Sequence, residues 1–133
     1  MTNKVFFYGT LMKGFERPGR AKVDQSLDSI GRGWITGSLY DLGIYPAAVP
    51  SAEGQIWGEV HDMCDPETVL RELDQLEGFR PDEPDTSLYT RSESAVTLED
   101  GRVVDAWVYY YNAPLGRAQR IATGDYLDHL KIR

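Results

Sequence analysis

Residues 88–112, LYTRSESAVTLEDGRVVDAWVYYYN, decide the fold class of this 133-residue chain. Two runs within this stretch, Leu88–Leu98 and Arg102–Asn112, are rich in β-branched and aromatic residues. The residues between them, Glu99-Asp100-Gly101, are typical of a tight turn. Two such runs joined by a short turn predict an antiparallel β-hairpin. The sheet is therefore expected to be mainly antiparallel.

Three segments before the hairpin also have strand composition: Val5–Tyr8, Ser29–Leu42 and Gly54–Met63. The glycines of the second segment suggest bulges or close backbone approaches. Near the C-terminus, Ile121–Ile132 is amphipathic and is expected to form a helix or a strand. Because strands and helices do not alternate, the pattern favours an α+β domain on a mainly antiparallel sheet or barrel.

Two polar or turn-rich segments are expected to be irregular. Lys13–Arg20 contains two glycines and a proline, and Gly43–Pro46 joins a glycine to an X-Pro bond, both of which favour non-helical geometry.

One helix is strongly specified, over residues 66–77. Asp65 is a good N-cap, Pro66 suits the first helical position, Glu67 places an acid in the first turn, and Gly78 can close the C-terminus.

Composition limits the class of protein and of partner. An apolar content of 41% over this length predicts a single domain spanning residues 1–133. The net charge of −7 and a pI near 4.7, with no Lys or Arg run longer than two, oppose binding to nucleic acid or to a membrane surface. The oligomeric state stays open.

The cysteine content and the N-terminus indicate a cytoplasmic protein. Cys64 is the single cysteine, so an intramolecular disulfide is excluded and a reducing compartment is expected. The N-terminal residues lack the apolar length of a signal peptide, and no stretch approaches the length of a transmembrane helix. Two histidines and one cysteine do not form a zinc-ligand pattern.

Glu77 departs from the pattern of the expected helix. At about 100° per residue, the Val and Leu residues form an apolar stripe, and Glu77 projects into it between Leu70 and Leu73. The other charged residues, Asp74 among them, project to the edges of the stripe or to the opposite side.

Burial and the helix dipole both act on this carboxyl group. Each raises its pKa from the usual ~4.3 toward neutrality. Such a group suits a general acid and base near pH 7. The alternative is that Glu77, in the last turn, swings to solvent or pairs with Arg80 or Arg91.

The segment Tyr8-Gly9-Thr10-Leu11 is the second unusual feature, because a buried strand runs directly into Gly and a hydroxyl residue. A turn here leaves backbone N–H groups without ladder partners, and such groups can hold a carboxylate or a developing oxyanion. The alternative is a plain strand-ending turn in which Thr10 caps the next segment.

Three tyrosines and one arginine are further candidates for the site. Tyr45, Tyr89 and Tyr110 could form pocket walls or belong to the core. Arg91 could steer a substrate carboxylate, although a simple ion pair with an acidic neighbour across the sheet is favoured.

A cysteine mechanism is the rival enzyme class. Cys64, just before a helix, could act as nucleophile with His61 as base. On a strand these two positions face opposite sides, so a structural cysteine is favoured.

A series of short motifs extends along nearly the whole chain: VFFYGTL (5–11), GSLYDLG (37–43), YPA (45–47), GEV (58–60), LDQLEGF (73–79), LYTR (88–91), AWVY (106–109) and GDY (124–126). In order and spacing they resemble the gamma-glutamylcyclotransferase-like family, especially its branch of gamma-glutamylamine cyclotransferases and related small bacterial and plant proteins. Two departures are the absence of Asn-His in the polar segment after Gly14, and Phe79 where relatives commonly carry Tyr.

The resemblance implies a small mixed, mainly antiparallel β-barrel with flanking helices. It also implies that Tyr8–Leu11 line the substrate pocket and that Glu77 is the catalytic acid/base. The implied enzyme needs no metal or cofactor and is of the amide C–N lyase or acyltransferase type. It would convert a gamma-glutamyl amine or amino acid into 5-oxoproline and a free amine. The alternative is a non-catalytic module that binds a small ligand in the same pocket.

Overall fold

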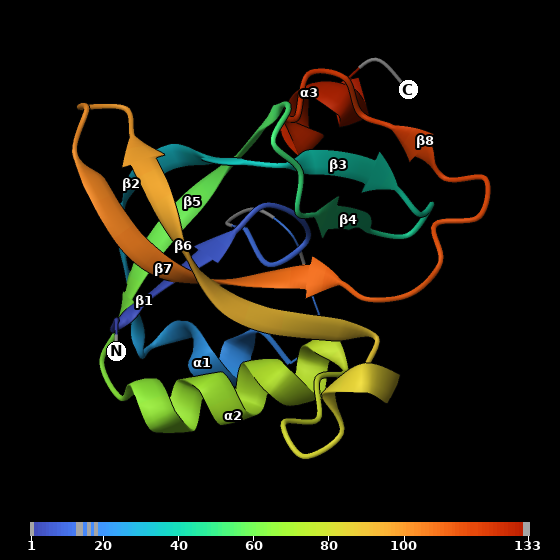
Figure 1. Ribbon diagram of the computed structural model, residues 1–133. Helices are drawn as coiled ribbons and strands as arrows, with labels where there is room; N and C mark the ends of the chain where they lie inside the picture. Colours follow the sequence, from blue (N-terminus) through green and yellow to red (C-terminus); the bar gives the residue numbers. More distant parts are fainter. Residues whose placement is uncertain (1, 13–14, 16, 18, 132–133) are drawn as a thin grey trace.

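The computed structural model describes residues 2–12, 15, 17 and 19–131 (Figure 1). Its strands are β1 (Lys4–Phe7), β2 (Leu27–Thr36), β3 (Ser38–Asp41), β4 (Pro46–Val49), β5 (Gln55–Met63), β6 (Tyr89–Leu98), β7 (Val103–Tyr111) and β8 (Gln119–Arg120). Its helices are α1 (Ala21–Asp24), α2 (Pro66–Glu77) and α3 (Tyr126–Lys131), with a short 3-10 helix, η1 (Pro84–Thr86).

Five strands close into a barrel in the order β1-β5-β2-β6-β7. β1 runs parallel to β7 through Val5 and Trp107, whereas the other described barrel pairs are antiparallel. β4, β3 and β8 form a separate three-stranded sheet. Figure 1 shows α1 and α2 below the barrel and α3 beside the smaller sheet. The expected α+β fold, a mixed and mainly antiparallel barrel with flanking helices, is confirmed.

The hairpin that defined the fold class is present. β6 and β7 pair from Tyr89 opposite Tyr111 to Thr97 opposite Val103. The turn is closed by hydrogen bonds from the amide of Leu98 to the carbonyl of Arg102 and from the amide of Gly101 back to Leu98.

The strand expected over Ser29–Leu42 is wrong as one element. β2 ends at Thr36 and belongs to the barrel, whereas β3 begins at Ser38 and belongs to the other sheet. The chain changes sheet at Gly37, whose amide donates to the carbonyl of Gly54 at 3.2 Å. The expected bulge is confirmed, because the β2–β5 register shifts between Ser29 and Gly31.

Helix α2 begins and ends where its capping residues predict. The Asp65 side chain accepts from the amide of Thr68 at 3.4 Å. Gly78 has φ +70°, a left-handed conformation that glycine adopts without strain, and it ends the helix.

The core joins α2 to the barrel. Its fully or almost fully buried side chains include Phe6, Ile56, Val60 and Val108 from the strands and Val69, Leu70 and Leu73 from the helix. The expected apolar stripe of the helix is therefore confirmed. Asp74, which projects to the edge of the stripe or to the opposite side, is nevertheless buried, at 6% exposed.

The remaining segments agree only in part with expectation. The C-terminal segment forms α3 from Tyr126, and Ile132 lies outside the described residues. The segment expected to be irregular, Lys13–Arg20, also lies partly outside them, because residues 13, 14, 16 and 18 are not described.

Among the described residues, no helix is long and apolar enough to cross a membrane.

Candidate active site

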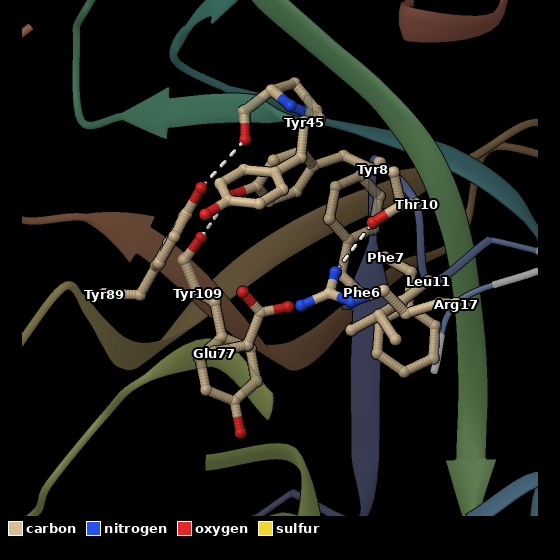
Figure 2. A pocket seen from close by; sticks show the side chains of 12 residues that line it. Phe6, Phe7, Tyr8, Thr10, Leu11, Arg17, Tyr45, Glu77, Tyr89 and Tyr109 are labelled. Atoms are coloured by element: carbon tan, nitrogen blue, oxygen red, sulfur yellow. Dashed lines mark hydrogen bonds between the residues drawn. The ribbon is translucent and has the colours of Figure 1, made fainter. Parts of the chain in front are cut away.

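A pocket lies where β1 ends, between the C-terminus of α2 and the start of β4 (Figure 2). It contains about 350 Å³ of space not filled by atoms, part of it open to solvent. The described lining residues are Phe6, Phe7, Tyr8, Gly9, Thr10, Leu11, Arg17, Tyr45, Pro46, Glu77, Tyr89 and Tyr109.

Glu77 is the acidic residue of this lining. It is the last residue of α2, and its side chain points into the pocket (Figure 2). Burial raises its pKa to about 7, against the lowering effect of the nearby Arg17 charge. No residue that the structure describes donates a hydrogen bond to this carboxylate. Glu77 therefore neither swings fully to solvent nor pairs with Arg80 or Arg91, which bind Glu83 and Asp74.

The segment Tyr8–Leu11 forms the opposite wall. The amide of Met12 donates to the carbonyl of Gly9 at 3.0 Å and closes a turn. Among the described residues, none accepts a hydrogen bond from the amide of Thr10 or Leu11. These two amides are thus available to an anion near the pocket.

Tyr8 connects this turn to the barrel. Its hydroxyl donates to the carbonyl of Tyr109 at 2.5 Å and accepts from the amide of Ala48 at 3.4 Å. Burial, followed by the charges of neighbouring groups, raises the pKa of Tyr8 well above its ordinary value. The hydroxyl therefore remains protonated at neutral pH and serves as a fixed hydrogen-bond donor.

Tyr45 and Tyr89 both line the pocket, with ring centroids 6.4 Å apart. The Tyr89 hydroxyl donates to the carbonyl of Pro46 at 3.0 Å, which ties β6 to the start of β4. Tyr110 is not part of the described lining, and its hydroxyl lies 2.7 Å from that of Ser94.

Tyr109, which was not among the predicted site residues, is the β7 tyrosine that lines the pocket. The register of the β6–β7 hairpin indicates which β7 tyrosine faces the pocket. Tyr89 pairs with Tyr111, and side chains alternate along a strand, so Tyr109 shares the pocket face and Tyr110 points away.

Arg17 is a further lining residue that was not among the predicted site residues. Its Nη1 donates to Oγ1 of Thr10 at 2.7 Å, and its Nη2 donates to the carbonyl of Leu76 at 3.1 Å. Its guanidinium lies 5.7 Å from the centroid of the Tyr45 ring. An arginine in a polar loop follows neither helical nor strand periodicity, so sequence patterns do not indicate where its side chain lies. Its position in the pocket is shown only by these contacts in the folded chain.

Arg91 forms the simple ion pair that was favoured, but its partner lies on a helix rather than across the sheet. Its Nε and Nη2 donate to the two carboxylate oxygens of Asp74 at 2.8 and 3.2 Å. The guanidinium also lies 4.6 Å from the Trp107 ring and 5.6 Å from the Phe79 ring.

Cys64 and His61 lie outside the described lining. Cys64 is exposed, whereas His61 is 1% exposed, with Nε2 3.2 Å from Oε1 of Glu59 and its ring 5.2 Å from that of Phe7. No described contact joins the two residues. Within the described ranges, no group of three His, Cys, Asp or Glu residues is placed to hold a metal ion.

Comparison with known proteins gives a consistent result over nearly the full chain. The family model described as "Gamma-glutamyl cyclotransferase, AIG2-like" matches residues 5–128. The gamma-glutamylcyclotransferase family protein YtfP of Escherichia coli K12 is 32% identical over 130 residues, covering 96% of this chain and 99% of YtfP.

Solved structures agree in fold. YkqA from Bacillus subtilis matches with a TM-score of 0.74 and 27% identity over 99% of this chain, which spans 42% of YkqA. The solution structure of Escherichia coli YtfP matches with a TM-score of 0.63 and 30% identity, covering 95% of this chain and 97% of YtfP. An AIG2-like protein from Mus musculus matches with a TM-score of 0.65 and 26% identity, covering 84% of this chain and 79% of the mouse protein.

Proposed function

Because this chain belongs to the gamma-glutamyl cyclotransferase, AIG2-like family, we propose that it cyclises a gamma-glutamyl amine or gamma-glutamyl amino acid. Family membership supports a gamma-glutamyl cyclotransferase-like function, and the particular substrate and mechanism are our proposal. The products are 5-oxoproline and a free amine, and Glu77 is the general acid and base. The observation that carries the proposal is a partly buried carboxylate with a raised pKa and no described hydrogen-bond donor, which shares a pocket with a turn whose Thr10 and Leu11 amides have no described acceptor.

The substrate contains its own nucleophile. The α-nitrogen attacks the γ-carbonyl carbon, forms the new C–N bond of a five-membered ring, and then the original amide C–N bond breaks. The α-ammonium nitrogen loses two protons and the leaving nitrogen gains two, so the reaction needs no oxidant, reductant or water. Correct orientation of such an intramolecular attack lowers the activation free energy by roughly 7 to 11 kcal/mol.

Glu77 is suited to relay these protons. With a pKa of about 7, it can accept a proton from the α-ammonium group and return one to the departing nitrogen at neutral pH. Thr10 and Leu11 line the same pocket, and their amides can bind a substrate carboxylate or the oxygen that gains charge.

A panel of gamma-glutamyl amines and dipeptides, assayed for release of 5-oxoproline, tests this proposal. We expect turnover by the native protein and a loss of about 10²- to 10⁴-fold in Glu77→Gln, the range for a general acid–base group. Glu67→Gln is the matched control, because Glu67 is an exposed residue in the first turn of the same helix.

The outcomes separate the two candidate functions. Turnover that survives Glu77→Gln contradicts the assigned role. Absence of turnover across the panel, together with binding of the same compounds by calorimetry, favours the small-ligand binding module.

A further inference from the structure

We infer that Arg17 binds the α-carboxylate of the substrate and makes the site specific for a free α-amino acid head group. This inference rests on the proposed function and deepens it, because it says which part of the substrate the pocket recognises by charge. It starts from Arg17 and Glu77, the two charged residues in the described lining.

The guanidinium of Arg17 is held in place but is not saturated. Its two described hydrogen bonds go to neutral oxygens, the Thr10 hydroxyl and the Leu76 carbonyl. A guanidinium carries five N–H donors. No carboxylate among the described residues forms an ion pair with Arg17, whereas Arg91 is paired with Asp74. As far as the described residues go, Arg17 therefore has both charge and donors left for an anion.

The position of Arg17 matches the charge pattern of an α-amino acid. The ammonium and carboxylate groups of such a compound are attached to the same carbon atom, so their binding groups must also be neighbours. Arg17 donates to the carbonyl of Leu76, the residue directly before Glu77, and to the side chain of Thr10, whose amide has no acceptor among the described residues. An ammonium at Glu77 thus places the adjacent carboxylate beside Arg17 and the turn.

The rest of the described lining carries no formal charge at neutral pH. It is formed by aromatic, apolar and hydroxyl side chains, with Tyr45 and Tyr89 on the β4 and β6 side. The leaving amine therefore meets no charged anchor among the described residues. We expect the requirement for Arg17 to be the same whatever amine leaves.

The test pairs a gamma-glutamyl amide with its α-carboxamide counterpart, in which the carboxylate is neutral. Arg17→Gln is expected to lower kcat/KM for the carboxylate compound by about 10- to 100-fold, the range for a lost charge-assisted hydrogen bond, and for the carboxamide by less than about threefold. Arg17→Lys is expected to recover part of the loss. Arg71→Gln removes the same charge from an exposed position on α2 and is expected to change neither value.

Two results overturn the inference while leaving the proposed function intact. An equal loss on both compounds shows that Arg17 only supports the fold of the pocket. A loss confined to leaving amines that carry a carboxylate assigns Arg17 to the other end of the substrate.

A binding measurement separates failure of the inference from failure of the proposed function. Calorimetry with 5-oxoproline and with 2-pyrrolidinone, the same ring without the carboxylate, does not require turnover. Tighter binding of 5-oxoproline that Arg17→Gln weakens by about tenfold or more supports the anchor even if no gamma-glutamyl compound reacts. Equal binding of the two rings by the native protein overturns it.

Discussion

The hydroxyl of Tyr109 donates a hydrogen bond of 2.6 Å to Oδ1 of Asp74, one helical turn before Glu77. Arg91 binds the same carboxylate, and the backbone carbonyl of Tyr109 accepts from Tyr8. Helix α2, the barrel strands and the turn after β1 are therefore linked through one network. Asp74 and Glu77 thus have different surroundings on the same helix. Asp74 forms an ion pair with Arg91 and ties the helix to the barrel, whereas Glu77 has no described hydrogen-bond donor.

Asp74→Asn is expected to destabilise the protein by about 2 to 4 kcal/mol, because Arg91 is left largely buried without its counter-charge. Urea unfolding measures this loss. Asp82→Asn, at an exposed position in the loop after α2, is the control and should change stability by less than about 0.5 kcal/mol. Equal stability of the two variants would show that the buried network contributes little.

The raised pKa of Glu77 predicts that ionisation of this side chain lowers the free energy of unfolding at alkaline pH. Between pH 4.5 and 7 the native state keeps a proton on Glu77 that the unfolded chain has released, so stability falls as pH rises and levels off above 7. Glu77→Gln removes this cost. We expect the variant to gain about 2 to 3 kcal/mol over the native protein between pH 5 and pH 8.5, as measured by unfolding at each pH. A constant difference contradicts the raised pKa.

The same pKa predicts the pH dependence of catalysis. Because the proposed base must be ionised, kcat/KM should rise with pH and reach half its maximum near pH 7. Arg17 lowers the pKa of Glu77, so Arg17→Gln should move this midpoint to higher pH. Arg71→Gln, with the same change in net charge, should leave the midpoint in place; an equal shift in both variants would point to overall charge.

Gly9→Ala is expected to disturb the pocket through a clash. A Cβ at this position meets Cγ and Cδ of Pro46 at 2.7 and 2.8 Å, and a proline ring has little freedom to move. We expect a loss of about 1 to 3 kcal/mol in stability, measured by urea unfolding. Pro46→Ala removes both clashing atoms, so the double variant should regain part of the loss. Strict additivity of the two changes would exclude this contact as the cause.

Alkylation of Cys64 with iodoacetamide should leave turnover within about twofold of the untreated protein, the small change expected at an exposed position away from the site. Cys64→Ser is the control for alkylation elsewhere. Inactivation of the native protein that the serine variant escapes would instead support the cysteine mechanism.

Several features could be predicted because they depend on neighbours in sequence. Helix α2 is specified by Asp65 and Gly78 at its ends, and the β6–β7 hairpin by its turn. The place of Glu77 follows from helical periodicity, which projects it among apolar side chains. The family resemblance is confirmed by the match over residues 5–128.

Other features could not be predicted because they depend on residues distant in sequence. The separation of β2 from β3 depends on which strands they pair with, and composition does not encode partners. The burial of Asp74 was missed since helical projection does not show that Arg91 and Tyr109 meet it from the barrel.

The sequence by itself determined the fold class, the main helix and the carboxylate within its apolar stripe, because caps, turns and periodicity are local properties of the chain. Tertiary structure alone decided what surrounds that carboxylate. Burial raises the pKa of Glu77, and Arg17 reaches the site by contacts with Thr10 and with Leu76, which is 59 residues away. Charge and solvation act through space, so the chemical character of the site becomes defined only once the barrel and the helix meet.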